Sequence, residues 1–330
     1  MVKKLFAVGI ILLFVCVSIP STGKVMEQSS TVSSDGNTLY VGGSGEGNYT
    51  KIQDAINDAS FGDTVFVYNG TYVENLVVYA SINLIGENRN TTVIDGNGIG
   101  YTIFLYYTCS RITINGFTIQ NSGSEGYYDS GIFIHEAHGV IITDNIVKSN
   151  MHGIYLDCTI DCQIRKNIII ENEVGILDLG QSTPHYCFNT TIVGNYISKN
   201  DCGIINALYS IGMISNNTIT DNGIGIKHDM GSNDIVCMRN NISNNNIGLY
   251  STYGLAVVQN NFINNTQHVK LRGFHSFLLN IYNSTLKRNY WDKPRKLPYP
   301  IPVRIGFHGL IPWFPQFDWH PARKPYDIEV

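Results

Sequence analysis

The feature of this 330-residue chain that most restricts its fold is an internal repeat of about 22 residues. Glycines followed by an apolar residue recur at spacings of 22, 22, 28, 22 and 23, at Gly131, Gly153, Gly175, Gly203, Gly225 and Gly248. Asparagines keep step with them, at Asn145, Asn167, Asn195 and Asn217, and Asn240 and Asn261 continue the series within one residue. Both series lengthen by six residues between Gly175 and Asn195, so one insertion, within "GQSTPHYCFNTT", interrupts a regular repeat.

Each repeat carries the two-residue alternation of strands. In "GIYLDCTIDCQIRKNIIIENEV", Ile154 and Leu156 alternate with other residues, and "QIRKNIII" supplies a second strand before an Asn-rich turn. No repeat offers a helix-period segment long enough for a crossover helix. The sequence therefore predicts an all-β chain, a right-handed parallel β-helix whose coils of about 22 residues stack ~4.8 Å apart. We expect the asparagines to take left-handed turn conformations and to bond to neighbouring coils.

The two ends of such a solenoid need caps, because each would otherwise expose strand edges and core. An amphipathic helix is predicted near 50–60, where Thr50 and Gln53 have the spacing of a capping box. Eight of the ten prolines and all three tryptophans lie after residue 290, which predicts a capping tail. We expect a β-helix over 38–270 and the last coil with the tail over 271–330.

The N-terminus, "MVKKLFAVGIILLFVCVSIPSTG", has a basic start and an apolar run that are typical of a secretory signal. We predict a signal peptide over 1–24 and a linker over 25–37, with an uncleaved membrane anchor as the alternative. The net charge of -4 argues against nucleic-acid binding. We expect a secreted or cell-surface monomer that is not an integral membrane protein after cleavage.

A family resemblance rests on the opening and closing segments. "YTKIQDAINDASFGDTVFVYNGTYVEN" resembles the opening of the carbohydrate-associated β-helix proteins, which include pectin methylesterases and NosD-type periplasmic copper-maturation proteins. The Gly-Ile coils and the closing "NYWD…PYDIEV" are more similar to NosD-like secreted proteins common in archaea. The resemblance covers roughly 38–330 and implies a right-handed β-helix that works at polysaccharides or cell-surface glycans.

We predict a protein that binds or presents at a polysaccharide or cell-surface glycan. The alternatives are a polysaccharide lyase or uronate epimerase acting on acidic glycans, and a NosD-like copper-maturation accessory protein. The chain lacks the Gln-Asp-Thr and Asp-Phe-Ile-Phe strings of pectin methylesterases and the Asn-Thr-Asp, Asp-Asp and Gly-His-Gly strings of polygalacturonases. An esterase or hydrolase of those types is therefore disfavoured. Lyases and epimerases leave little linear signature, because their acid-base groups are scattered over adjacent coils.

Coil stacking predicts a candidate catalytic site. The fifth residues of successive coils should point outward, which makes His135 and Asp157 neighbours, with Glu136 beside them. Such a group can supply a general base and a charge stabiliser for proton abstraction next to a uronate carboxylate, with Arg165 or Lys166 offsetting the substrate charge. The alternative is that outward columns of any solenoid are polar.

Other residues are candidates for binding. Three aromatic residues at outward third positions, Phe133, Tyr155 and Tyr250, can stack on sugar rings, or are strand residues covered by loops. His228 and Asp229 form a second His-Asp neighbour pair, four coils from His135.

The cysteines allow three interpretations. The six cysteines outside the predicted signal, Cys109, Cys158, Cys162, Cys187, Cys202 and Cys237, are compatible with disulfides, buried thiols or copper ligands. We assign no metal site and no cofactor.

Overall fold

The computed structural model describes residues 36–107, 109–180, 187–208, 210–229, 235–252, 254–273, 284–305 and 316–328. All of them belong to one compact unit, Ser34–Val330. The predicted signal peptide and nearly all of the predicted linker lie outside the described residues, as does the middle of the predicted insertion.

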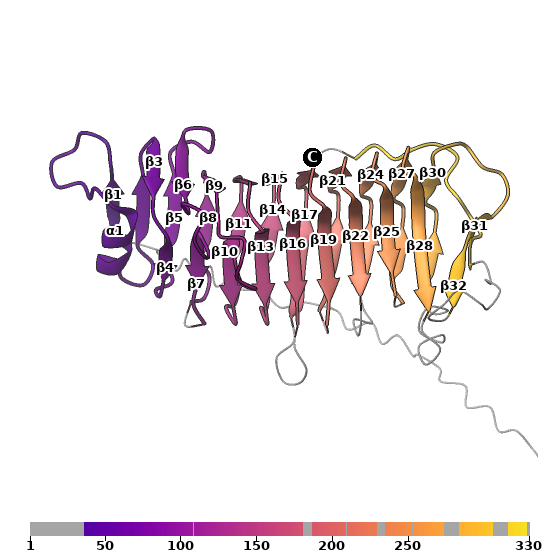
Figure 1. The fold of residues 1–330 in the computed structure, drawn as a ribbon, viewed down its shortest axis with the longest axis horizontal. Coiled ribbons are helices and arrows are strands. Elements are labelled where there is room, and N and C mark those ends of the chain that lie inside the picture. The colour runs from indigo at the N-terminus through magenta and orange to yellow at the C-terminus, as the bar shows by residue number, and fades with distance from the viewer. Residues whose placement is uncertain are drawn as a thin grey trace, which may run out of the picture. The chain divides into compact units, whose positions relative to one another are not determined.

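These residues form a right-handed parallel β-helix of about ten turns, with three parallel sheets along its length (Figure 1). Sheet A contains β1 (Thr38–Val41), β2 (Thr64–Val67), β5 (Asn83–Gly86), β8 (Thr113–Asn115), β11 (Ile141–Thr143), β14 (Gln163–Arg165), β17 (Phe188–Val193), β20 (Ile211–Ser215), β23 (Ile235–Met238), β26 (Ala256–Val258) and β29 (Thr285–Lys287). Sheet B contains β3 (Gly70–Val73), β6 (Thr92–Asp95), β9 (Thr118–Gln120), β12 (Ile146–Lys148), β15 (Ile168–Ile170), β18 (Tyr196–Ser198), β21 (Thr218–Thr220), β24 (Asn241–Ser243), β27 (Asn261–Ile263) and β30 (Tyr290–Trp291). Sheet C contains β4 (Leu76–Val78), β7 (Ile103–Leu105), β10 (Ser130–His135), β13 (His152–Asp157), β16 (Val174–Leu179), β19 (Cys202–Ala207), β22 (Ile224–Asp229), β25 (Ile247–Ser251), β28 (Gln267–Gly273) and β32 (Val303–Ile305). The C-terminal segment adds a small antiparallel pair, β31 (Tyr299–Ile301) and β33 (Gln316–Asp318).

The repeat sets the strand register, as predicted. In sheet C, Ile132 pairs with Ile154 and Ile154 with Ile176, so residues one repeat apart lie on neighbouring strands. Alternate residues of each strand point into the lumen of the helix, where stacked Ile, Val and Leu side chains form one continuous core.

The glycines of the repeat are required by close approach of the backbone rather than by their own conformation. A Cβ added at Gly175 would lie 2.5 Å from the carbonyl oxygen of Gly203, and one at Gly203 would lie 2.6 Å from that of Gly225. Any side chain at these positions would push neighbouring coils apart. This contact explains why one glycine recurs in each coil.

Two asparagine ladders hold the corners on either side of sheet B. The first ladder lies between sheets A and B and comprises Asn145, Asn167, Asn195, Asn217, Asn240, Asn260 and Asn289. The second lies between sheets B and C and comprises Asn150, Asn172, Asn200, Asn222, Asn245 and Asn265. The sequence predicts Asn261 in the first ladder, whereas its neighbour Asn260 occupies that position.

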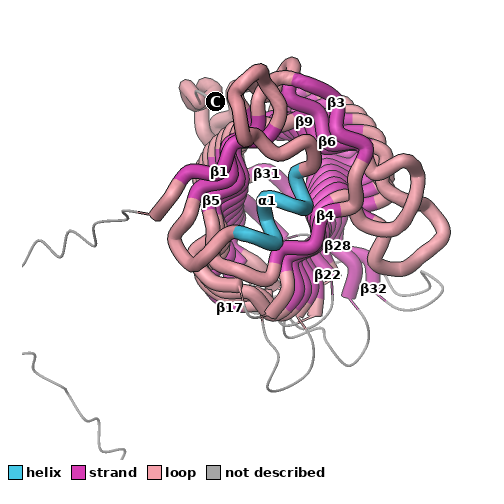
Figure 2. Tube along the Cα trace, turned by 90° about the vertical axis from the view of Figure 1, so that its left-hand side faces the viewer, coloured by secondary structure: helices cyan, strands magenta, loops and turns pink. Residues whose placement is uncertain are grey.

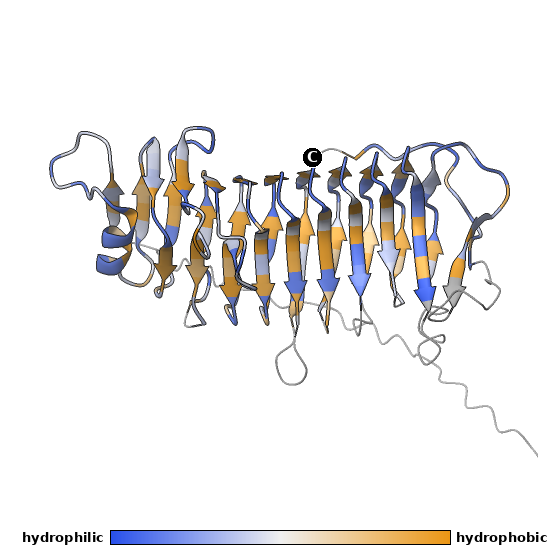
Figure 3. Cartoon of the chain, viewed as in Figure 1, coloured by the Kyte–Doolittle hydropathy of each residue, from blue (hydrophilic) through white to orange (hydrophobic). Residues whose placement is uncertain are grey.

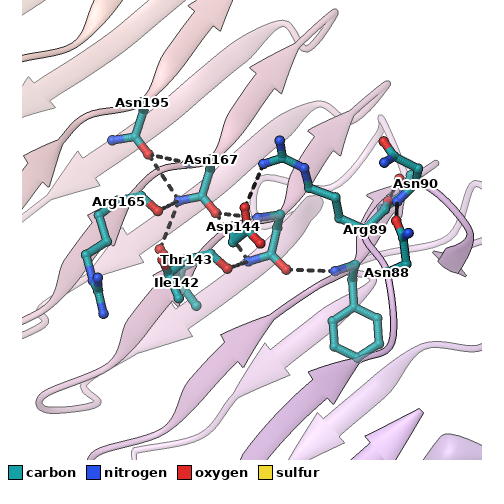
Figure 4. A network of polar contacts seen from close by, with 12 residues as sticks. Asn88, Arg89, Asn90, Ile142, Thr143, Asp144, Arg165, Asn167 and Asn195 are labelled. Atoms are coloured by element: carbon teal, nitrogen blue, oxygen red, sulfur yellow. Dashed lines mark hydrogen bonds and ion pairs between the residues drawn. The ribbon is translucent and has the colours of Figure 1, made fainter. Parts of the chain in front are cut away.

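Each ladder asparagine bonds in both directions along the helix (Figure 4). Asn167 donates from its backbone N and from Nδ2 to Asn195 Oδ1, at 3.0 and 3.1 Å. Its Nδ2 also donates to the carbonyl oxygens of Ile142 and Arg165, at 2.9 and 3.0 Å. Its own Oδ1 accepts from the Asn145 backbone N at 3.0 Å. One side chain thus satisfies polar groups of three coils.

The expectation that the ladder asparagines are themselves left-handed is wrong. The left-handed residue is the one before each asparagine, such as Lys166 with a φ of 56° or Glu171 with a φ of 58°. Such a conformation in a residue with a Cβ costs about 1 kcal/mol or more. The ladder hydrogen bonds of the following asparagine offset that cost.

Both ends of the described solenoid are covered. Helix α1 (Ile52–Asp58) lies across the first coils with Ile52, Ala55 and Ile56 buried (Figure 2). The predicted capping box is not formed; instead the Glu74 carboxylate accepts from the Ile52 and Gln53 backbone N at 2.9 and 3.0 Å.

At the other end the C-terminal segment closes the first ladder. Asp318, which is fully buried, accepts from the Asn289 backbone N at 2.8 Å and from Trp291 Nε1 at 3.1 Å. The Trp291 ring stacks on Phe262 and Tyr299. Further along, Tyr326 and the Asn261 side chain exchange two hydrogen bonds, which attach the tail to β27.

The third corner, between sheets C and A, differs from the other two. By the strand bounds, the β10–β11 connection has five residues, 136–140, whereas the β16–β17 connection has eight, 180–187. Among the described residues, no asparagine ladder runs along this corner. The carboxyl ends of β10 and β13 in sheet C lead into it, so the residues predicted for the site lie beside it.

Candidate functional site

The structure brings His135 and Asp157 together at the third corner. They are the last residues of β10 and β13 and occupy paired positions in sheet C. His135 Nδ1 lies 2.8 Å from Asp157 Oδ2, and 33% of the His135 side chain is exposed against 4% of the Asp157 side chain. Asp157 is further held by the Cys158 thiol, which donates to Oδ1 at 3.3 Å.

This geometry orients the imidazole. A carboxylate only accepts, so the proton between the two side chains belongs to His135 Nδ1 and the lone pair of the neutral ring to Nε2. The buried carboxylate can stabilise the ring when Nε2 takes up a proton. The pair therefore has the arrangement of an oriented general base.

The other predicted catalytic and charge-offsetting residues are placed differently. Glu136 follows His135 in a left-handed turn and donates its backbone N to the Asp157 carbonyl oxygen at 2.8 Å. Arg165 ends β14 of sheet A, and its carbonyl oxygen belongs to the first ladder (Figure 4). It thus lies on a different sheet from the His-Asp pair. At the third corner, the exposed Arg111 lies against Gly139.

Aromatic rings cover the outer face of sheet C beside the pair. Phe133 and Tyr155 are 6% and 2% exposed and form a cluster separate from the main core, on the outer side of sheet C. The loop before β10 covers them, because Tyr128 stacks on both rings at centroid distances of 5.2 and 6.1 Å. Burial raises the pKa of Tyr155, so its phenol stays neutral.

The cluster extends into an exposed row, which we call the aromatic row. Its members are Tyr79, Tyr101, Phe104, Tyr106, Tyr107, Tyr127, Tyr128, Phe133 and Tyr155, each in ring contact with at least one other. Four of them are half exposed or more: Tyr79, Tyr107, Tyr127 and Tyr128. His135 stacks against Phe133 at 5.8 Å, so the row borders the His-Asp pair.

Farther along the same face, sheet C becomes cationic. The column that contains Phe133 and Tyr155 continues through Leu177 and Ile205 to Lys227, Tyr250 and Lys270. Lys270 Nζ lies 5.5 Å from the centroid of the Tyr250 ring. The hydropathy colouring shows this change, from apolar strands at β7 and β10 to polar β22 and β28 (Figure 3). Tyr250 thus lies at the cationic end rather than with the aromatic row.

The second predicted pair, His228 and Asp229, is divided between the two faces. His228 is fully buried in the lumen, whereas Asp229 points outward and lies 3.4 Å from Lys227 Nζ. The alternation of a strand sends consecutive side chains to opposite faces, so these two residues do not form a surface dyad.

All six cysteines of the β-helix are buried thiols, and the structure contains no disulfide among the described residues. Burial raises the pKa of the Cys162 thiol to about 11 and that of Cys237 to about 12. The disulfides that the sequence allows are therefore not formed, and Cys109, Cys162 and Cys237 pack as small apolar residues of the core.

Comparison with known proteins agrees with the fold. The model of the family described as periplasmic copper-binding protein (NosD) matches residues 56–296. The chain belongs to the NosD family. No curated protein matches the chain.

Solved structures similar to this NosD-family chain are parallel β-helix proteins. They include an alginate lyase from Paenibacillus sp. str. FPU-7, with 14% identity over 72% of this chain and 93% of that chain and a TM-score of 0.54. The complex of XylC with xylose has 11% identity, 86% and 73% coverage and a TM-score of 0.59. Pectate lyase Pel9A has 13% identity, 79% and 82% coverage and a TM-score of 0.57. At these identities the similarity establishes the fold alone.

The described residues do not form a binding site that fits the copper named in the family description. Within the described ranges, no three His, Cys, Asp or Glu side chains are grouped so as to hold a metal ion. Copper binds thiolates, whereas burial opposes ionisation of these thiols. We therefore derive no chemistry through copper. The described part of this NosD-family chain also contains no helix long and apolar enough to cross a membrane.

Two parts of the site were missed by sequence reasoning. The repeat does not predict a role for the tyrosines of the loop before β10, because that loop lies outside the repeat. The adjacent tyrosines Tyr127 and Tyr128 are nevertheless a sequence signal for an aromatic surface. The inward fourth positions of the coils turn polar at Asp178, Asn206 and His228. The sequence prediction considers the outward third and fifth positions and leaves these inward residues out.

Proposed function

We propose that this protein binds a polysaccharide along the outer face of sheet C, over the aromatic row. The observation that carries the proposal is the row itself, with its half-exposed tyrosines held by stacking on a buried aromatic base. Flat rings held in this way present apolar faces to the C–H surfaces of sugars, and their hydroxyl groups can bond to sugar hydroxyls. The structural neighbours named for alginate, pectate and xylose support a carbohydrate ligand.

Affinity electrophoresis through gels containing alginate, polygalacturonate or xylan tests this proposal. We expect one of these polymers to retard the wild-type protein. Truncating the exposed ring in Tyr128→Ala should weaken retardation about fivefold to tenfold, the effect of losing one aromatic contact. The matched control is Tyr196→Ala, which removes a 39% exposed tyrosine from sheet B. Equal retardation of both variants would contradict the proposed face.

The hydrogen-bonded His135 and Asp157 favour a second function, a polysaccharide lyase or uronate epimerase. In a lyase, His135 Nε2 would take the proton from C5 of a uronate and the C5 electron pair would form the C4–C5 double bond. The C4–oxygen bond would break, and the leaving oxygen would keep its electron pair and take a proton from water. Asp157 would stabilise the imidazolium, and Arg111, which lies on the same corner against Gly139, is our candidate in place of Arg165 for offsetting the uronate charge.

Ultraviolet absorbance of new unsaturated ends measures this activity directly. We expect His135→Ala to abolish turnover and Asp157→Asn to reduce it, because the asparagine keeps the shape but loses the charge. His138→Ala removes an exposed histidine from the same corner and should leave turnover unchanged. Glycan binding without any turnover in the wild-type protein would leave binding as the function and discard the lyase.

A further inference from the structure

A column of four polar residues runs along the lumen on the inner face of sheet C, beginning in the coil after Asp157. In successive coils of sheet C the inward position passes from Leu156 to Asp178, Asn206, His228 and Ser251, and then returns to Leu271. The four polar side chains are at most 1% exposed. Leucine and isoleucine fill the equivalent position in the coils before them, so the fold itself does not need polar groups here.

Hydrogen bonds satisfy only part of this column. Asp178 Oδ2 accepts from Asn206 Nδ2 at 2.9 Å and from the Ser210 hydroxyl. Asp178 Oδ1 and Asn206 Oδ1, in contrast, have no hydrogen-bond partner. Both of these atoms are acceptors, and leaving buried acceptors unsatisfied is unfavourable.

The charge of Asp178 is also unbalanced. The ion pairs of the described residues join other side chains, and none involves Asp178. A buried carboxylate without a cation carries a large desolvation cost. A bound cation would satisfy both acceptor oxygens and the negative charge at once, and a single carboxylate is neutralised by a single positive charge.

We propose that Asp178 and Asn206 bind a monovalent alkali cation, Na⁺ or K⁺, within the lumen. The carboxylate Oδ1 and the amide Oδ1 are hard oxygen ligands, which alkali and alkaline-earth cations prefer. A divalent ion would leave one excess positive charge in the core. The site is independent of glycan binding, because it lies on the opposite side of sheet C from the aromatic row.

The cation competes with a proton for the same carboxylate. Burial raises the pKa of Asp178 in the folded protein. Without a cation, the folded state therefore holds this proton more tightly than the unfolded state, and the stability so gained is lost as the pH rises through the folded pKa. A bound cation replaces that contribution at higher pH, so its effect should grow with pH and fade in acid.

Thermal melting at equal ionic strength in KCl, NaCl and choline chloride tests the proposal, since choline is too large to enter. The protein is refolded in each salt so that the lumen equilibrates. We expect the wild-type melting temperature at pH 8 to be about 5 °C higher in one alkali salt than in choline, as for a ligand at ~100 times its Kd. The difference should shrink towards pH 4.

Two variants assign the effect to the column. Asp178→Asn keeps the shape without the charge, and Asn206→Ala removes the amide oxygen but leaves the carboxylate; both should melt alike in alkali and choline salts. Asp201→Asn, at an exposed position, is the matched control and should keep the wild-type difference. Equal wild-type melting in all three salts, or an alkali effect that survives Asp178→Asn, would overturn the proposal.

Discussion

The corners beside sheet B and the corner between sheets C and A are built on different principles. The first two are lined by asparagine ladders in which each side chain bonds to the coils before and after it. The third corner varies in loop length and carries the His135–Asp157 pair, and the polar column lies just inside it. A solenoid can vary one corner freely when the other two fix the stacking of its coils. We therefore infer that two corners stabilise the fold and the third carries function.

The largest effect should follow from breaking a ladder. In Asn167→Leu, the Asn145 backbone N and the carbonyl oxygens of Ile142 and Arg165 lose their partner. We expect the free energy of unfolding to fall by about 3–5 kcal/mol. Urea denaturation measures it, with the exposed Asn246→Leu as control. A loss below about 1 kcal/mol would mean that the ladders do not carry the stability assigned to them.

Removing the end of the first ladder should have a smaller effect. Asp318→Ala deprives Asn289 and Trp291 of a shared acceptor, and we expect a loss of about 2 kcal/mol. Asp318→Asn keeps one oxygen, as in every other rung, so its melting temperature should lie between those of the alanine variant and the wild type. If both variants melt like the wild type, Asp318 does not stabilise the end of the first ladder.

Changes at the third corner should cost least. His135→Ala removes a ring that is 33% exposed and should change the free energy of unfolding by less than about 1 kcal/mol. Asp157→Ala should cost about 1 kcal/mol, because the carboxylate is buried and accepts from two groups. If either variant is as unstable as Asn167→Leu, the third corner is as structural as the ladders.

The thiols should be silent in the folded protein. Because burial raises the pKa of Cys162, Cys202 and Cys237 to about 11 or 12, few thiolates exist at pH 8. We expect a thiol reagent to label them only after unfolding in denaturant. Rapid labelling of the native protein would show that the lumen opens.

Much of this division was visible in the sequence. Gly153, Gly175 and Asn167 recur because coil stacking imposes the same contact in every turn, so the fold and the pairing of His135 with Asp157 could be predicted from spacing alone. The repeat does not predict the structure of segments that lie outside it. Some features depend on contacts between segments that share no repeat. They are the loop that bears Tyr128, the capping of α1 by Glu74 and the position of Arg165 on sheet A, away from the His-Asp pair.

The inward polar residues could have been predicted from the repeat, although the sequence prediction did not include them. Asp178 and His228 occupy fourth positions of their coils, which alternation assigns to the lumen, yet a charged side chain in a strand is usually read as outward. Applying the register strictly would have identified the column and separated His228 from Asp229.

Hydrogen exchange measured by mass spectrometry, with and without the polysaccharide that retards the protein, tests the central claim most directly. If the third corner and the outer face of sheet C carry function, bound polymer will slow exchange in peptides covering residues 101–107, 123–135 and 153–157. Peptides from the two ladder corners, such as 143–150, will exchange as in the free protein. Slowing confined to the ladder corners, with residues 123–135 unaffected, would contradict the account.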